Sequence, residues 1–182
     1  MFRFIAFLRA INVGGGRTVK MQSLRQVFES LGFSKVTTFI ASGNVVFETT
    51  TNKTKALEKK IERALKAALG YEVRTFVRGE NDLAKIANYR PFPQSKFDET
   101  SNIIFLADDL TEKLKQNVEA LRTKTDVFEV HGREIYWQRR RKQNKALFST
   151  VPLEKILGPA FTVRGTNTIK RIVLKYCSSK VC

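Results

Sequence analysis

Apolar positions in the first half of the chain predict an alternation of strands and helices. Residues 4–11 are rich in apolar and aromatic side chains over the length of a strand, and this run is followed by three consecutive glycines. The next apolar positions recur at steps of three and four residues, which is the spacing of one helix face. Gly32 follows where a left-handed cap would end that helix. The positions on this face are Met21, Leu24, Phe28 and Leu31.

Three further patterns complete the first half. Two β-rich runs, 36–40 and 45–48, flank Ala41-Ser42-Gly43-Asn44, whose residue types are typical of a hairpin turn. A helix that begins near residue 52 or 54 has one apolar face and ends at Gly70. Residues 72–78 then predict another strand. This order of strand, helix, hairpin, helix and strand is the split βαβ arrangement of ferredoxin-like domains.

The second half repeats much of this order. After a short helix over about residues 81–88 and a proline-containing connection, the pattern predicts a strand over 102–107 and a helix over 111–121. A second hairpin pairs residues 127–130 with 134–138 across His131-Gly132. The chain closes with a helix that has an apolar stripe and an opposite basic face. The stripe is Ile169, Ile172, Val173 and Tyr176, and the basic face is Lys170, Arg171 and Lys175.

Two stretches of the second half echo the first. Residues 102–106 resemble 4–8, and residues 135–137 resemble 45–47. The first copy holds about nine extra residues, which fall in its glycine-rich loop. We therefore predict an α+β fold of two related ferredoxin-like subdomains built from a duplicated βαββα unit. The expected division is 1–79 for the first subdomain, 80–101 for a connecting helix and linker, and 102–182 for the second subdomain with its basic terminal helix.

The composition is that of an ordinary globular protein. The chain has 182 residues, of which 42% are hydrophobic and 27% charged, so a disulfide scaffold and extensive disorder are excluded. No apolar run reaches the roughly 20 residues of a membrane-spanning helix, and the N-terminus does not fit a secretory signal. We expect a cytoplasmic protein with no membrane partner. Cys177 and Cys182, both near the C-terminus, are expected to have no role in chemistry.

The charge is strongly positive and unevenly distributed. There are 33 Lys and Arg against 17 Asp and Glu, which gives a net charge of +16. The segment from Gln138 onward contains 11 basic residues and one acidic residue. Two interpretations stay open, a solvated face and a site for nucleic acid or another phosphate-rich partner. The run Arg139-Arg140-Arg141-Lys142 follows Tyr136-Trp137, which are neighbours on a predicted strand, so that one of the two rings is expected in the core. No segment matches the RNA-recognition signature.

The glycine-rich segment is the first candidate site. Residues 11–18 have the backbone freedom to turn several N–H groups toward an anion, and nearby basic side chains would supply compensating charge. Neither the Walker nor the dinucleotide glycine pattern is present. A structurally tight loop is the alternative, but its extra length relative to the second copy favours a functional role. The candidate ligand-binding residues here are Arg9, Asn12, Gly14, Gly15, Gly16 and Arg17.

Two other polar segments are candidates for the same cleft. Ser42 and Asn44 lie in the first hairpin, where Gly43 and Asn44 would equally serve positive-φ positions without a ligand. Arg164 and Asn167 precede or begin the last helix, whose N-terminus would favour an anion, while Thr166 or Asn167 would also serve as its N-cap.

The inventory for acid–base chemistry is thin. His131 is the only histidine and is predicted in a hairpin turn, which excludes a Ser-His-Asp, Cys-His or two-histidine metal constellation. Asp108-Asp109 precede a helix, where acidic residues complement the helix dipole. We therefore expect no metal and no cofactor, and the catalytic residues are unknown.

The N-terminal block carries a family resemblance. Phe4-Ile5-Ala6-Phe7-Leu8-Arg9-Ala10-Ile11-Asn12-Val13-Gly14-Gly15, Leu31-Gly32-Phe33 and Ile40-Ala41-Ser42-Gly43-Asn44-Val45-Val46-Phe47 closely resemble the bacterial family catalogued as domain of unknown function 1697. Arg164-Gly165-Thr166-Asn167-Thr168 is similar to its terminal Arg-Asn-x-Asn-Thr element. Ala10 stands where the family has Gly, and Gly165 where it has Asn. The resemblance implies an α+β fold of two related ferredoxin-like subdomains and implies no activity.

These observations lead to one main hypothesis and two others. The first is a non-enzymatic binding protein for a phosphate-bearing ligand, with nucleic acid as one candidate, whose cleft joins the glycine loop, the Ser42–Asn44 turn and Arg164. The alternative is a small-molecule enzyme that acts on a phosphorylated or carboxylated metabolite by positioning and electrostatic stabilisation. A third is a structural partner protein with the terminal basic helix as its contact surface.

Overall fold

The computed structural model describes residues 1–12, 18–92, 99–140 and 150–177. Gly14, Gly15, Gly16 and Arg17 of the predicted cleft lie outside these ranges. The chain forms two compact units, one of Met1–Lys85 with the segment from Lys170 onward, and one of Ile86–Ile169. These limits fall inside two helices, and the predicted division at 79 and 102 stays a prediction.

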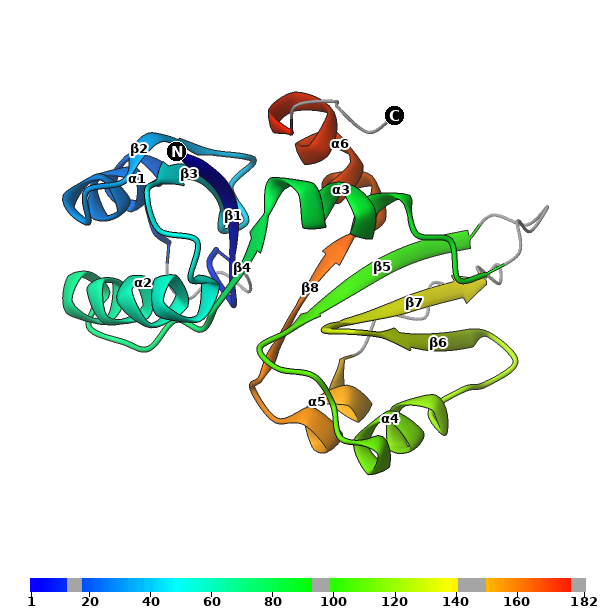
Figure 1. Ribbon diagram of the computed structural model, residues 1–182. Coiled ribbons are helices and arrows are strands. Elements are labelled where there is room, and N and C mark those ends of the chain that lie inside the picture. Colours follow the sequence, from blue (N-terminus) through cyan, green and yellow to red (C-terminus); the bar gives the residue numbers. More distant parts are fainter. Residues whose placement is uncertain (13–17, 93–98, 141–149, 178–182) are drawn as a thin grey trace. The chain divides into compact units, whose positions relative to one another are not determined.

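The first unit is a four-stranded antiparallel sheet with the strand order β2-β3-β1-β4. Two helices, α1 and α2, cover one face of it (Figure 1). Alternate residues of the central strand, such as Phe4, Ala6 and Leu8, join these helices in one apolar core. The elements are β1 (Phe2–Leu8), α1 (Met21–Ser30), β2 (Ser34–Thr38), β3 (Asn44–Thr49), α2 (Thr54–Leu69), β4 (Thr75–Gly79) and α3 (Glu80–Asn88).

The second unit has an antiparallel sheet of the same kind, with the order β6-β7-β5-β8. Its helices α4 and α5 pack on one face through Val118 and Leu153 (Figure 1). The described residues therefore form a mixed α+β protein with two similar sheets and six helices. The elements are β5 (Glu99–Leu106), α4 (Glu112–Glu119), β6 (Asp126–His131), β7 (Glu134–Arg140), α5 (Val151–Leu157), β8 (Phe161–Gly165) and α6 (Thr166–Tyr176).

The strand register supports the internal echo of the sequence. Ile5 of β1 pairs with Val46 of β3, and Ile103 of β5 pairs with Tyr136 of β7. The same alignment makes Leu8 equivalent to Leu106, and each donates its N–H to the turn of its hairpin, at Gly43 O (2.8 Å) and Arg133 O (2.9 Å). Strands β1, β3 and β4 thus match β5, β7 and β8 residue by residue, whereas β2 has a register shift between Ser34 and Thr37 that β6 lacks.

Two elements of the second unit were missed by the sequence patterns. Helix α5 has seven residues with a proline in its first turn, and β8 has five residues, of which three are only partly buried. A helix of seven residues has less than two turns, and a strand of five has few alternating positions. Neither is long enough to show a clear hydrophobic period. With α5 and β8 the second unit is completed to βαββαβ, the same order as the first.

The helix caps follow the predicted glycines. Gly32 and Gly70 both have a positive φ, 78° and 77°, directly after α1 and α2. Only glycine adopts this conformation without a steric cost, so the chain can leave each helix there. In α4, the Thr111 hydroxyl caps the helix by accepting the Leu114 N–H.

The end of α6 belongs to the first unit. Arg3 on β1 donates to the backbone carbonyl of Tyr176 (2.6 Å) and forms ion pairs with Glu48 (2.8 Å) and Glu80 (3.3 Å). The Tyr176 ring also meets Phe39 edge-on at 6.1 Å between centroids. Cys177, which the sequence placed near an exposed terminus, is instead buried, and burial raises the pKa of its thiol to about 11.

Candidate functional site

The end of β1 and the β2–β3 turn pack tightly together in the first unit. Gly43 has a φ of +69°, and a Cβ at this position would lie 3.0 Å from the Ile11 Cβ and 3.1 Å from the Leu8 Cβ. Both its conformation and its surroundings therefore require glycine. We call this region, formed by Leu8–Asn12 and Ile40–Asn44, the first-unit corner.

Asn12 closes the base of the glycine-rich segment. Its Nδ2 donates to the Val19 carbonyl (3.1 Å), and its Oδ1 accepts the Val19 N–H (2.7 Å). The two hydrogen bonds hold residues 12 and 19 side by side, so the ends of the intervening segment meet at the corner. Because both ends of the amide are used in this way, Asn12 acts as a clamp on the backbone.

Asn44 has a similar backbone-holding role in the turn. It is fully buried, and its Nδ2 donates to the Phe39 carbonyl (3.1 Å) and to the Ser42 Oγ (2.9 Å). The Phe39 N–H in turn donates to the Asn44 carbonyl (2.9 Å). Ser42 is half-buried, and the hydrogen bond from Asn44 orients its hydroxyl. The structural interpretation of this turn is thus supported, and a ligand role for its side chains stays a prediction.

Unusual backbone conformations gather at the corner. Ala10, Asn12 and Ile40 have φ values of 57°, 56° and 51°, in addition to the glycine at position 43. A left-handed conformation is most costly for a β-branched residue such as Ile40, which is also exposed. Such strain persists only where the surroundings enforce it, and it is frequent at functional sites.

Arg9 brings positive charge to the corner. Its backbone N–H donates to the Arg74 carbonyl (2.9 Å), which makes the two arginines neighbours across β1 and the segment that leads into β4. Arg9 is partly buried and Arg74 is exposed. The structure therefore brings together Arg9, Asn12, Ser42 and Asn44 of the predicted site in one region of the first unit.

The other predicted residues belong to the second unit. Arg164 lies on β8, where its Nη1 donates to the Thr162 hydroxyl and to the Val163 carbonyl, both at 2.8 Å. Burial lowers the pKa of its guanidinium to about 10, which still leaves the group charged at neutral pH. Asn167 is exposed in the first turn of α6. Their predicted contribution to the cleft stays a prediction.

Arg164 has a counterpart that the sequence patterns missed. Arg78 on β4 pairs with Ile5, as Arg164 pairs with Ile103, and its Nη1 likewise donates to the carbonyl of the preceding valine (3.0 Å). The signal was the tripeptide Val-Arg-Gly, which occurs at 77–79 and again at 163–165, each time directly before a helix. This echo would also have located β8.

The aromatic residues beside the basic run are not surface platforms. Trp137 and Tyr136 are both buried, although only one of the two was expected in the core. Tyr136 lies on the opposite face from Trp137 and donates its hydroxyl to the Ile86 carbonyl (3.3 Å). A buried ring offers no face for a base to stack on. Of the basic run, the side chains of Arg140, Arg141 and Lys142 lie outside the described residues.

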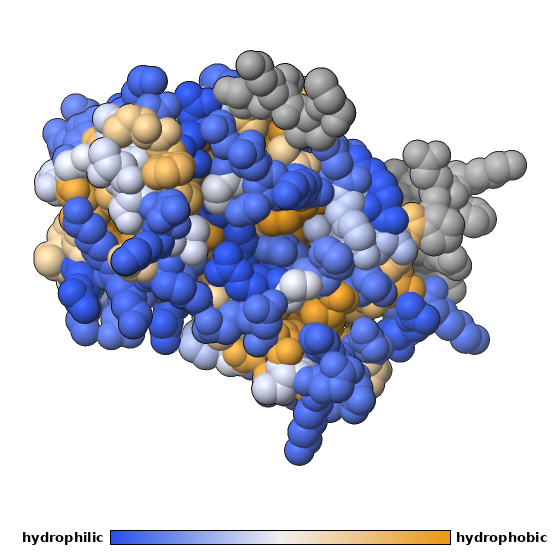
Figure 2. All heavy atoms as spheres, viewed as in Figure 1, coloured by the Kyte–Doolittle hydropathy of each residue, from blue (hydrophilic) through white to orange (hydrophobic). Residues whose placement is uncertain are grey.

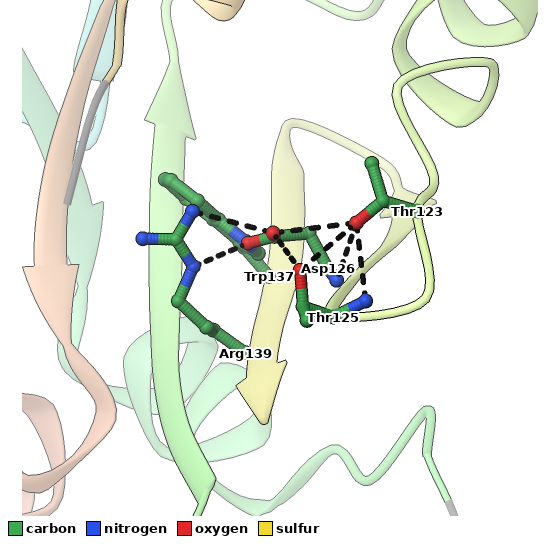
Figure 3. Close-up of polar contacts among 5 residues, drawn as sticks. All are labelled: Thr123, Thr125, Asp126, Trp137 and Arg139. Carbon is green, nitrogen blue, oxygen red and sulfur yellow. Dashed lines mark hydrogen bonds and ion pairs between the residues drawn. The ribbon is translucent and has the colours of Figure 1, made fainter. Parts of the chain in front are cut away.

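Arg139 and Trp137 instead share a carboxylate. Asp126 Oδ1 accepts from the Trp137 Nε1–H and from the Arg139 Nε–H, both at 2.7 Å (Figure 3). Thr125 adds a third bond at 2.9 Å. Burial acts to raise the pKa of Asp126, but the bonds from Arg139, Trp137 and Thr125 outweigh it and the pKa is lowered. This cluster is structural, because it satisfies a buried indole N–H.

The described residues offer little for metal or acid–base chemistry. No group of three or more His, Cys, Asp or Glu in them could hold a metal ion. His131 ends β6 beside Gly132, as the hairpin prediction required, and it is exposed with its ring stacked on Tyr89 at 4.4 Å. None of the helices described is long and apolar enough to cross a membrane.

The fold and the corner define a mixed α+β protein with two sheets of the same strand order. Among the described residues, the elaborated corner belongs to the first sheet. The chain belongs to the family described as Protein of unknown function (DUF1697), whose model matches residues 1–136. This confirms the resemblance seen in the sequence.

A solved structure is similar over nearly the whole chain. It is that of a conserved bacterial protein from Streptococcus pneumoniae, with a TM-score of 0.75 and 23% sequence identity. The match covers 95% of this chain and 97% of the other. At this identity the likeness establishes the fold alone. No curated protein matches the chain.

Proposed function

We propose that this protein is a non-enzymatic binding protein for a phosphate-bearing ligand, and that the ligand binds at the first-unit corner. The Asn12–Val19 clamp is the observation that carries the proposal. It fixes both ends of a segment that contains three consecutive glycines, at the end of a central strand. A glycine-rich backbone held in this way is suited to direct its N–H groups toward an anion.

The charge at the corner supports an anionic ligand. Arg9 and its neighbour Arg74 lie at the base of the segment, and Lys20 follows the clamp. Arginine matches the geometry of phosphate oxygens through paired N–H groups. The net charge of +16 adds a long-range attraction for polyanions, which raises the rate of encounter without choosing the site.

Two phosphate sources fit this chemistry, a free phosphorylated molecule and the backbone of a nucleic acid. We favour the free molecule, because the described part of the sheet presents no aromatic pair for base stacking, and Tyr136 and Trp137 are both buried. Nucleic acid binding through the backbone alone is the second outcome that the test distinguishes.

Calorimetric titration with inorganic phosphate tests the proposal at about 0.15 M salt, where diffuse attraction is screened. We expect saturable binding that Asn12→Ala weakens by about ten-fold or more, because the clamp is lost. The matched control is Asn117→Ala, which removes an exposed asparagine of α4.

A fluorescent single-stranded oligonucleotide provides the second arm. Binding tighter than that of a lysozyme-like basic protein at the same salt would favour the nucleic-acid source. If neither phosphate nor the oligonucleotide binds better than to that basic control, the proposed function is wrong.

We also propose that both sheets are ferredoxin-like, because each combines the order βαββαβ with a sheet order in which the first strand lies between the third and the fourth. The expected division into 1–79, 80–101 and 102–182 and the expected cytoplasmic location belong to the same proposal.

A further inference from the structure

A basic groove lies beside α2 in the first unit, and of its lining residues Arg74 also neighbours Arg9 of the corner. It has a volume of about 320 Å³ and is open to solvent between α2 and the segment that leads into β4. The surface over α2 is largely hydrophilic (Figure 2). The residues that line the groove are Lys59, Glu62, Arg63, Lys66, Glu72, Val73 and Arg74.

The acidic side chains of the groove are already engaged. Glu62 accepts the backbone N–H of Thr75 (2.9 Å), and Glu72 forms an ion pair with Lys66 (3.0 Å). In the described part of the chain, neither Lys59 nor Arg63 has a carboxylate within ion-pair distance. With four basic residues and two acidic ones in its lining, the groove keeps a net positive charge, and Lys59 and Arg63 are free of ion pairs among the described residues.

The basic residues of α2 are arranged along one side of the groove. Lys59, Arg63 and Lys66 follow each other at steps of four and three residues, which places them on one helix face. At 1.5 Å per residue, these steps are about 6 and 4.5 Å along the helix axis. Lys59 and Lys66 are thus about 10.5 Å apart along the axis with Arg63 between them, and a pair of linked phosphates spans more of this row than a single phosphate does.

The described residues of the second unit show no such arrangement. Its equivalent helix, α5, has 7 residues against the 16 of α2, and Lys155 is its single basic residue. The groove is thus an addition to one copy of a duplicated fold. Such additions to a shared scaffold are where binding functions are frequently found.

We propose that this groove binds a pyrophosphate group, with Arg63 and Lys59 as its main contacts. The group would belong to free pyrophosphate or to a nucleoside diphosphate, because both present two linked phosphates to the groove. Arg63 supplies a planar fork of donors for phosphate oxygens, and Lys59 a compact charge for the second phosphate. This site goes beyond the proposed corner site and does not depend on it.

Calorimetric titration of the full chain with inorganic pyrophosphate tests the proposal at about 0.15 M salt. We expect Arg63→Gln to weaken binding by about ten-fold, and Lys59→Gln by a smaller factor. The matched controls are Arg122→Gln and Lys113→Gln, which remove one exposed positive charge each from the second unit. Because all four side chains are exposed, the substitutions should leave the fold intact, as circular dichroism would verify.

Several outcomes would overturn the proposal that the groove binds pyrophosphate. They are no measurable binding of pyrophosphate, equal weakening by Arg63→Gln and Arg122→Gln, and orthophosphate binding as tight as pyrophosphate binding. A nucleoside diphosphate that binds as tightly as pyrophosphate, or more tightly, supports the proposal and indicates that the nucleoside is tolerated or contacted. Asn12→Ala should change pyrophosphate affinity by less than about two-fold, so failure of the corner and failure of the groove are distinguishable.

Discussion

The two sheets share strand order and, for three of their four strands, register, but they differ in what is attached to them. Leu8 and Met21 are separated by twelve residues in the first unit, whereas Leu106 and Glu112 are separated by five in the second. The helix after the hairpin is also longer in the first unit. The comparison teaches that two sheets of one strand order carry different attachments, and that the clamped segment, the strained corner and the basic groove belong to the first unit.

One pair of equivalent core positions shows how the two cores differ. Phe47 on β3 lies among phenylalanines, with the Phe33 ring at 4.5 Å and the Phe28 ring at 5.5 Å. At the matching position of β7 stands Trp137, which stacks on Phe128 at 5.2 Å but also carries an N–H group. A buried N–H group is costly without an acceptor, and the Asp126 carboxylate accepts this one.

Removal of Asp126 is expected to have the largest effect. Asp126→Ala leaves the Trp137 N–H and the Arg139 guanidinium without their shared acceptor, and should lower the free energy of unfolding by about 3 kcal/mol. Chemical denaturation measures this change. Asp109→Ala, at an exposed aspartate before α4, should change it by less than about 0.5 kcal/mol. Equal small losses in both variants would refute the structural role of the carboxylate.

The two hairpin glycines offer a direct comparison of the units. Gly43→Ala introduces a Cβ 3.0 Å from Ile11 in addition to left-handed strain, and should cost about 2 kcal/mol. Gly132→Ala meets nothing closer than 3.9 Å, so only the strain of about 1 kcal/mol remains. Thermal or denaturant unfolding of both variants checks the difference. A cost at Gly132 as large as that at Gly43 would contradict the tight packing of the corner.

Loss of the clamp should have a smaller effect on stability. Asn12→Ala removes two hydrogen bonds to Val19, and the free energy of unfolding should fall by about 1 to 2 kcal/mol. Hydrogen exchange should show faster exchange of the Val19 amide, whose acceptor is lost. Unchanged exchange at Val19 would mean that the clamp does not hold this backbone in solution.

Acid should weaken the fold gradually through two buried carboxyl groups, Glu48 and Asp126, whose pKa is lowered. The bonds from Lys35 and Arg3 lower the pKa of Glu48, as those from Arg139 and Trp137 do for Asp126 against the effect of burial. Their stabilisation is complete above the usual carboxyl pKa of about 4 and is lost as the pH falls through the lower folded-state values. Asp126→Asn, which cannot titrate, should flatten the dependence of unfolding free energy on pH between about 5 and 2. An unchanged profile would contradict the lowered pKa.

The repeat and most elements could be predicted because they depend on local patterns. The echo between 4–8 and 102–106 is carried by strand residues whose apolar character follows from burial, and the register confirms it. Helix α5 is too short to show a period, and β8 could have been located only through the Val-Arg-Gly echo of β4.

The site was predictable only in part. Arg9, Asn12, Ser42 and Asn44 were identified from residue types typical of turns and anion cradles, and the structure places them in one corner. Their contacts could not be predicted, because the side chain of Asn12 bonds to the backbone of Val19, seven residues further along the chain. The sequence of β7 does not show whether other elements cover both of its faces. For this reason Tyr136 and Trp137 were not both assigned to the core.

Amide chemical shifts recorded during titration with inorganic phosphate test the central claim most directly. The account predicts that shifts concentrate at the amides of residues 8–12, 18–20 and 42–44, while the equivalent amides at 106–110 and 132–134 stay unchanged. Equal shifts at the two sets of positions would contradict it, because the scaffold alone would then account for anion binding.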